Sequence, residues 1–245
     1  MSLKNKIAII LILIMAVSSM VYFAVFKFIV LKGFIEAETG DALHDMNQCI
    51  SVLTLETKHL DNFVHDWSSW DSTYSFVENR NQAFIDENLM LAVYLDQGIS
   101  LIHIYNNEGA LVWGKTYDLE TEEELPFDLE QELEGPLFSR IVSQKDPEGY
   151  TSGIIQTSIG PMVVASHPIL TSENQGPSNG AMVMGRVFTK DSIDSLSELA
   201  GVELDAWAVR DKDMPDTVRS LIDVLNAPGS VRIEHASPDI LHAYS

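Results

Sequence analysis

The amino-acid sequence predicts an α+β fold, in which an N-terminal transmembrane helix continues into a long helix that packs on an antiparallel sheet with short helices. Three observations support this prediction. Residues 7–26 carry no charge and are as long as the hydrocarbon core of a bilayer requires of a helix. Residues 36–77 repeat apolar side chains at helical spacing. Beyond residue 99, apolar or alternating runs are separated by turn residues, as strands joined by hairpins are.

The apolar N-terminal run predicts a membrane span over residues 7–31, because apolar residues continue past Lys27 through residues 28–31. A cleavable signal peptide is the alternative, since Lys4 and Lys6 give the chain a basic start. The uncharged run is longer than the usual signal core of about 7–15 residues, and no clear small-x-small cleavage site closes it. We therefore expect the chain to stay anchored in the bilayer.

The distribution of charge predicts the orientation of the chain in the cell membrane. Lys4 and Lys6 precede the span and the first acid is Glu36, so residues 1–6 should be cytoplasmic and residues 33–245 extracytoplasmic. All 36 acids but only 11 of the 15 basic residues lie from Glu36 onward, which gives this part a net charge of −25. Such a surface excludes nucleic acid as a partner, because its binding requires Lys and Arg to displace counterions. The acids are scattered, which favours a solvated surface over a functional acidic patch.

A long stem helix is predicted over residues 33–78, because its apolar side chains lie alternately three and four positions apart. This period is kept through about four heptads, the range in which coiled-coil packing becomes plausible, so we expect a homodimer. Gly40 is the weak point of the helix, and the single Cys49 excludes an intramolecular disulfide. The seam consists of Leu43, Met46, Ile50, Leu53, Thr57, Leu60, Val64, Trp67, Asp71 and Tyr74.

Residues 79–245 have the pattern of an antiparallel sheet with short helices. The clearest hairpin joins residues 100–105 to residues 110–117 through the turn sequence NNEG. A meander should follow it, because turn residues separate the next three apolar runs. The further strands are expected over residues 153–158, 162–169, 181–188, 202–209 and 231–235, and helices over residues 82–95, 136–142, 191–199 and 215–225.

The stretch HDWSSWDSTYSF, residues 65–76, concentrates aromatic, carboxylate and hydroxyl side chains. On one continuous helix Trp67, Asp71 and Tyr74 share a stripe and Trp70 lies on the next. Two aromatic rings and a carboxylate would suit an amine, an amino acid or a small cationic metabolite. The alternative is that the tryptophans are core and that the aspartates bond indole N–H or backbone groups.

A second group of candidates lies in the first predicted strand. His103 alternates with apolar neighbours and shares a face with Leu101 and Tyr105. If that face is turned toward the helical stripe, His103 and Tyr105 line a pocket, as does Trp113 on the partner strand. The predicted ligand-binding residues are Trp67, Trp70, Asp71, Tyr74, His103 and Tyr105.

Catalytic and metal chemistry have little support in the sequence. His65, Asp66 and the serines after them are neighbours, but on a helix they do not converge as a nucleophile, a base and an orienting group must. The seven histidines have no HExxH or CxxC spacing, although His65 with Asp66 could join a later histidine in the fold. No phosphate-binding loop, dinucleotide-binding loop or nucleophile elbow occurs. We predict no catalytic residue, metal or cofactor, and no enzyme within residues 1–245.

Residues 66–89, DWSSWDSTYSFVENRNQAFIDENL, resemble the opening motif of the fourth type of CHASE domain, an extracellular sensory module. That motif has Asp-Trp, two residues, Trp-Asp, a nearby Tyr, then Phe or Tyr-Ile before Asn-Leu. The hairpin NNEGALVWGKTYD is similar to the usual strand pair of the family. The matching positions are Asp66, Trp67, Trp70, Asp71, Tyr74, Phe76, Phe84, Ile85, Asn88 and Leu89.

The resemblance implies a PAS/Cache-like sensor, in which a long N-terminal helix packs beside an antiparallel sheet. Such domains usually lie between two membrane helices, upstream of a histidine kinase, a diguanylate cyclase or phosphodiesterase, or a chemoreceptor signalling region. We therefore expect an input domain for an unknown small molecule over residues 79–245, C-terminally incomplete, with the second span and the output region past residue 245. An anchored structural or adhesion ectodomain, or a secreted hydrolase, is the alternative.

Overall fold

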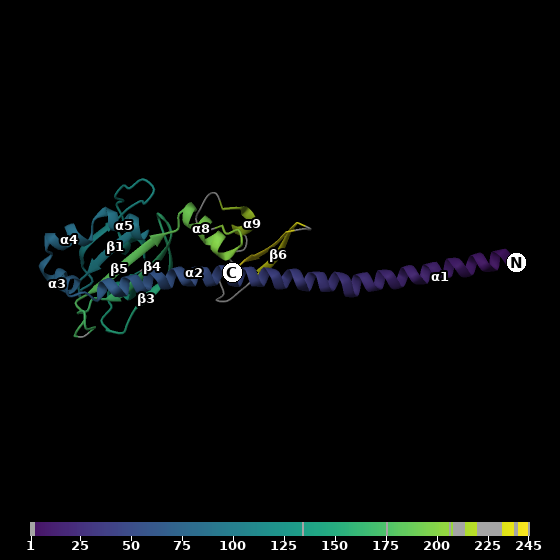
Figure 1. Cartoon of the computed structure of the whole chain (residues 1–245), viewed down its shortest axis with the longest axis horizontal. Coiled ribbons are helices and arrows are strands. Elements are labelled where there is room, and N and C mark those ends of the chain that lie inside the picture. The colour runs from purple at the N-terminus through teal and green to yellow at the C-terminus, as the bar shows by residue number, and fades with distance from the viewer. Residues whose placement is uncertain are drawn as a thin grey trace. The chain divides into compact units, whose positions relative to one another are not determined.

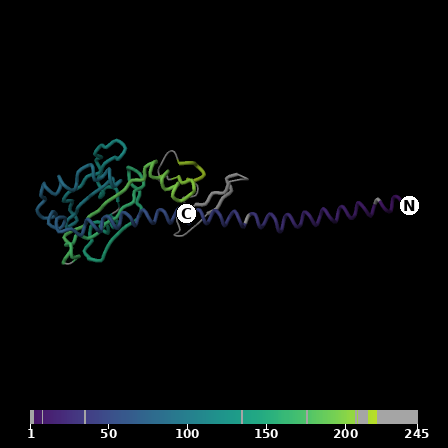
Figure 2. The backbone as a smooth tube through the Cα atoms, viewed as in Figure 1, coloured from purple at the N-terminus to yellow at the C-terminus, as the bar shows by residue number. Residues whose placement is uncertain are grey.

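The computed structural model describes residues 3–133, 135–174, 176–205, 207, 214–219, 232–237 and 240–244, and its backbone is traced in Figure 2. The chain divides into two compact units. The first comprises Met1–Gln48 and Asp223–Ser245, and the second comprises Cys49–Ile222.

The first unit begins with the N-terminal part of one long helix, and the residues of that helix from Cys49 onward belong to the second unit. Helical residues run without a break from Leu3 to Ser68, and this helix is long and apolar enough to cross a membrane by length and composition. It consists of α1 (Leu3–Val25), the π-helical turn η1 (Phe26–Val30) and α2 (Leu31–Ser68) (Figure 1). The apolar side chains of α1 are exposed, and a bilayer would cover them. In the same unit β6 (Arg232–Ser237) and β7 (Ile240–Tyr244) form an antiparallel hairpin, so the strand predicted over residues 231–235 is confirmed.

The second unit is built on a five-stranded sheet, which confirms the predicted α+β fold. Its strands are β1 (Leu101–Tyr105), β2 (Leu111–Thr116), β3 (Thr151–Thr157), β4 (Gly160–Pro168) and β5 (Ala181–Val187). Every neighbouring pair is antiparallel, in the order β2-β1-β5-β4-β3. Figure 1 labels β1, β3, β4 and β5 of this sheet. The predicted hairpin is β1–β2 and the predicted meander is β3–β4–β5. Short turns connect β1 to β2 and β3 to β4, whereas the longer loop of residues 169–180 connects β4 to β5.

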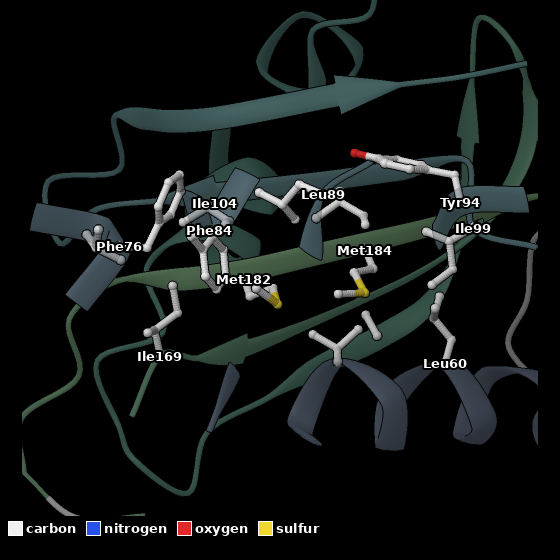
Figure 3. Close-up of a cluster of buried hydrophobic side chains, with 14 of the residues drawn as sticks. Leu60, Phe76, Phe84, Leu89, Tyr94, Ile99, Ile104, Ile169, Met182 and Met184 are labelled. Carbon is white, nitrogen blue, oxygen red and sulfur yellow. The ribbon is translucent and has the colours of Figure 1, made fainter. Parts of the chain in front are cut away.

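Each face of this sheet is covered by different helices, since alternate side chains of a strand point to opposite faces. The first face packs against α2 and against α3 (Asp71–Asn79), α4 (Gln82–Asn88) and α5 (Leu91–Gln97). Figure 3 shows this core, in which methionines of β5 meet side chains from the helices. Its fully buried members include Leu60, Val64, Phe76, Tyr94, Ile99, Ile102, Ile104, Ile169, Met182 and Met184.

The second face carries a smaller core. Leu101, Tyr105 and Val183 point to this side and pack with side chains of α6 (Leu129–Glu132) and α7 (Gly135–Val142). The helix predicted over residues 136–142 is therefore confirmed as α7. The burial of both faces explains why every residue of β1 is buried.

Several predicted elements have other boundaries in the structure. The helix expected over residues 82–95 is divided into α4 and α5, whereas the one expected over residues 191–199 is α8 (Lys190–Ala200). Thr189 caps α8 at its start and Gly201, with a φ of 71°, at its end. Residues 202–205 and 207 form no strand, so the strand predicted over residues 202–209 is wrong in its described part. Of the helix expected over residues 215–225, the described part is α9 (Asp216–Arg219), and residues 220–225 lie outside the described residues.

Candidate functional site

The helix expected to continue to residue 78 ends at Ser68, so the prediction of an unbroken stem is wrong at this point. Trp70 has an extended backbone, with φ −104° and ψ 136°, and precedes α3. Hydroxyl side chains replace helical partners at the break: Ser68 Oγ donates to His65 O at 3.0 Å, and Thr73 Oγ1 donates to Trp67 O at 2.9 Å. Serine and threonine hydroxyls compete with the helical backbone in this way. They donate hydrogen bonds to carbonyls that a helix end leaves without partners.

The break is fastened to the loop of residues 170–179, between β4 and β5. The backbone N–H of Ser172 donates to Asp71 Oδ1 at 3.0 Å, and the backbone N–H of Asp71 donates to Ser172 Oγ at 3.1 Å. Ser69 Oγ donates to Asn174 Oδ1 at 2.7 Å. Asp71 stands in the first turn of α3, where a carboxylate also interacts favourably with the helix dipole. The Asp71 carboxylate therefore holds this loop against the helix break.

The aromatic residues of the motif lie at the same break. The rings of Trp67 and Trp70 stack with centroids 4.9 Å apart and an interplanar angle of 26°. Trp67 and Tyr74 both pack against the core of the first sheet face. The Tyr74 hydroxyl donates to Pro177 O at 3.4 Å, and Asn179 Nδ2 donates to Tyr74 O at 2.8 Å. The structure thus brings Trp67, Trp70, Asp71 and Tyr74 together, and their direct contact with a ligand stays a prediction.

His103 and Tyr105 lie on the opposite face of the sheet from the motif, so the condition under which they would complete its pocket is not met. His103 is 2% exposed, with Nδ1 3.0 Å from the Tyr105 hydroxyl and Nε2 3.5 Å from Thr116 Oγ1. Gly114 makes room for the ring, because a Cβ there would lie 2.6 Å from His103 Cδ2. Burial lowers the pKa of His103 to about 4, and the charge of Asp128 opposes this shift only partly.

A cleft of about 610 Å³ lies beside α2 and next to the helix break. Its residues come from three segments that are far apart in the sequence: one face of α2, the loop of residues 147–150, and β4 with the loop that follows it. Asn174 belongs to this cleft and also to the contact with Ser69, which joins the motif to the cleft. The lining residues are Asp61, Asn62, His65, Pro147, Glu148, Gly149, Tyr150, His167 and Asn174.

The cleft contains a compact group of aromatic and ionisable side chains around His167. His167 Nε2 lies 3.0 Å from Asp61 Oδ1, which identifies Nε2–H as a donor to the carboxylate. The Tyr150 ring stacks on the His167 ring with centroids 5.5 Å apart and an interplanar angle of 7°, and the His65 ring stands edge-on at 5.2 Å. Burial lowers the pKa of His167, the hydrogen bond and charge of Asp61 raise it, and His65 lowers it further.

Part of this cleft could be anticipated from the sequence. The sequence left open that His65 and Asp66 could join a later histidine; in the structure His65 lies beside His167, and the carboxylate with them is Asp61 rather than Asp66. Asp61 and His65 are four positions apart, and this spacing places the two side chains on the same face of a helix. The sequence does not indicate that Tyr150 and Glu148 join this cleft, because they lie in a loop far from α2 in the sequence. Within the described part of the chain, no group of three or more His, Cys, Asp or Glu residues could hold a metal ion.

Comparisons with known proteins agree with the motif. A family model of the CHASE4 domain matches residues 52–207. The chain is 27% identical over 146 residues to the methanogenesis regulatory histidine kinase FilI of Methanothrix harundinacea (strain 6Ac), a match that covers 58% of this chain and 16% of that protein.

Two solved structures are also similar to this chain. The extracellular domain of a histidine kinase has a TM-score of 0.45 and 17% identity, over 68% of this chain and 63% of that chain. A domain of a sensory box/GGDEF family protein from Vibrio parahaemolyticus has a TM-score of 0.47 and 16% identity, over 62% and 61% of the two chains.

Proposed function

The chain belongs to the CHASE4 family, a family of sensory rather than catalytic domains, and from this we propose that it is the extracytoplasmic input region of a membrane-bound signal-transduction receptor. A histidine kinase is the output that the 27% identical relative favours over a diguanylate cyclase, a phosphodiesterase or a chemoreceptor. The apolar helix supports a membrane location, with residues 7–31 in the bilayer, residues 1–6 in the cytoplasm and the part from residue 33 outside.

The single observation that carries the proposed relay is the position of the cleft on α2. Asp61, Asn62 and His65 line it from this helix, and α2 belongs to the unbroken helical run that includes the apolar segment. A ligand that bridges α2 and β4 stabilises one arrangement of these elements over another. It moves that equilibrium only by the difference between its affinities for the two arrangements. The small molecule is therefore sensed in the cleft and the change is relayed along α2.

A homodimer suits this relay, and its interface is narrower than the predicted seam. Leu60 and Val64 are buried in the core of their own domain, so they are not free to face a partner. Leu43 and Ile50 are 37% and 42% exposed and keep the helical spacing of the seam. The dimer contact is therefore expected in the N-terminal half of α2, where a shift of the helix would alter the packing of two chains.

A topology experiment tests the membrane location. Alkaline phosphatase fused after residue 245 should be active in bacterial cells, and a green fluorescent protein at the same place should be dark, because the fusion point lies outside the cytoplasm. The fusion should stay with the membrane after a carbonate wash, and a chain that lacks residues 1–31 provides the inactive control. An inactive phosphatase fusion together with a fluorescent green fluorescent protein fusion would contradict the proposal. A fusion that the carbonate wash releases from the membrane would support a cleaved signal peptide instead.

A further inference from the structure

We infer that the cleft beside α2 binds a small organic cation that carries an ammonium group. This inference rests on the proposed sensory function, because it names the class of molecule sensed. The cleft volume of about 610 Å³ falls within the range of about 300–1,000 Å³ that is usual for small-molecule sites.

The first argument is the charge of the lining. Asp61 and Glu148 are the carboxylates of the cleft, and no lysine or arginine is among the nine residues that line it. The fixed charges of the lining are therefore negative, and the cleft belongs to a chain with a net charge of −21. Such a field raises the local concentration of cations and opposes the entry of carboxylates and phosphates. A ligand whose only charge is negative is therefore disfavoured.

The second argument is the arrangement of donors and acceptors at Asp61. The Nε2–H of His167 occupies Oδ1 at 3.0 Å, and this bond orients the carboxylate. A carboxylate accepts several hydrogen bonds, so Oδ2 remains an acceptor for an N–H group that enters the cleft. The Asp61 side chain is 18% exposed, which leaves it accessible from the cleft and less screened than a surface acid.

The third argument is the aromatic wall. Tyr150 stacks flat on His167 through one face, and the residue is 59% exposed, so part of its ring is open to the solvent. An ammonium group is attracted to the face of such a ring by about 0.5–1 kcal/mol at exposed sites. A bare metal ion lacks comparable support, because the described residues provide no group of three ligating side chains. The wall and the carboxylates together favour an organic ammonium.

Three four-carbon probes of different charge test the inference on the 245-residue chain in nanodiscs of zwitterionic lipid. Isothermal titration calorimetry should give saturable binding of 1,4-diaminobutane, and none of neutral 1,4-butanediol or anionic succinate, with empty nanodiscs as the blank. Asp61→Asn and Glu148→Gln should each weaken the binding of diaminobutane about tenfold, because a charge-assisted contact is lost. The matched controls Asp66→Asn and Glu173→Gln remove an exposed charge outside the lining and should change the affinity less than about twofold.

Glu148 is exposed, so Glu148→Gln leaves the fold intact and keeps the test independent of stability. Equal binding of butanediol or succinate, no saturable binding of diaminobutane, or equal losses in the lining and control variants would each overturn the inference. These outcomes leave the topology result unchanged. The topology fusions could conversely place residue 245 in the cytoplasm while diaminobutane binding depends on Asp61 and Glu148. That result would overturn the extracytoplasmic sensory proposal and would still support the binding site.

Discussion

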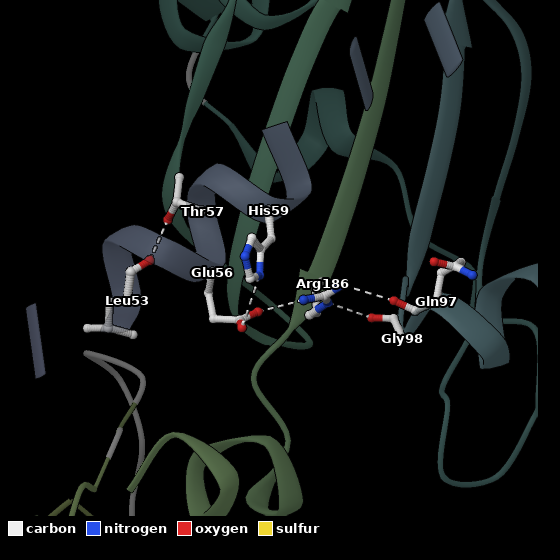
Figure 4. A network of polar contacts seen from close by, with 7 residues as sticks. All are labelled: Leu53, Glu56, Thr57, His59, Gln97, Gly98 and Arg186. Atoms are coloured by element: carbon white, nitrogen blue, oxygen red, sulfur yellow. Dashed lines mark hydrogen bonds and ion pairs between the residues drawn. The ribbon is translucent and has the colours of Figure 1, made fainter. Parts of the chain in front are cut away.

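Arg186 Nη1 lies 2.6 Å from Glu56 Oε2, and this ion pair joins β5 to α2 (Figure 4). The same guanidinium donates to the carbonyls of Gly98 and Gln97, each at 2.9 Å. These carbonyls lie at the C-terminal end of α5, where a positive charge also complements the helix dipole. One side chain therefore fixes α2 to the sheet and to a neighbouring helix, on the element that we propose to move.

Substitution of Arg186 should destabilise the second unit. Arg186→Ala should lower the free energy of unfolding by about 3 kcal/mol, because a partly buried carboxylate and two carbonyls lose their partner. Arg186→Lys should lose less, since it keeps the charge but not the fork of donors. Urea unfolding measures both, with Lys145→Ala as the exposed control. A loss in Arg186→Ala no larger than in that control would contradict a role in fixing α2.

Tyr94 carries a buried hydroxyl for which the described residues provide no hydrogen-bond partner. Tyr94 belongs to the core shown in Figure 3. Its ring stands edge-on to Tyr117 with centroids 4.8 Å apart, and burial raises the pKa of the Tyr94 hydroxyl well above the ordinary value. Tyr94→Phe should raise the free energy of unfolding by up to about 1 kcal/mol, because an unpaired buried polar group is removed. Tyr74→Phe, which loses the bond to Pro177, should lower it by about 0.5 kcal/mol. Destabilisation by Tyr94→Phe in urea unfolding would show that the hydroxyl is satisfied in solution.

Asp71 should act on stability through the loop of residues 170–179. Asp71→Ala removes the acceptor of the Ser172 N–H and a favourable charge at the start of α3, so the unfolding free energy should fall by about 1 kcal/mol. Asp71→Asn keeps an acceptor and should lose about half as much. Hydrogen exchange should become faster in the loop of residues 170–179 and not in β1. Unchanged exchange in that loop would show that the contact does not hold it.

Acid should destabilise the protein through His103, whose ring faces Tyr105, Thr116 and Asp128. Because its folded pKa is about 4 and its ordinary value is 6.5, the unfolded chain binds the proton first. The stabilisation that the neutral His103 ring contributes is complete above pH 6.5. It is lost as the pH falls toward 4, which lowers the free energy of unfolding by on the order of 3 kcal/mol. His103→Gln should flatten the dependence of urea unfolding on pH between 7 and 4, and the exposed His44→Gln should not. Equal slopes in all three proteins would contradict the burial of a neutral imidazole.

The sheet could be predicted because its signals are local. The turn NNEG lies between two apolar runs and specifies a hairpin without help from the rest of the chain. Thr189 and Gly201 likewise fix the ends of α8 from within the helix itself. Such features depend on backbone preferences over a few residues, so one sequence is enough to detect them.

The helix break and the cleft depend on contacts that no local pattern records. Ser68, Ser69 and Thr73 are compatible with a continuous helix. The contact that accompanies the break is made by Ser172, which lies 101 positions after Asp71 in the sequence. In the same way His167 lies 106 positions from Asp61, so their pairing follows from the fold rather than from spacing. The two faces of β1 were also indistinguishable in the sequence, because both are buried.

Asn174 contacts Ser69 of the motif and also lines the cleft, whereas Glu148 and Tyr150 lie in a separate exposed loop. If the cleft is the sensory site, as we propose, the residues that discriminate between molecules include Glu148 and Tyr150, which lie outside the tryptophan motif. New specificities can arise by exchange of residues 147–150 in one loop, so domains that share the tryptophan motif need not respond to the same compound.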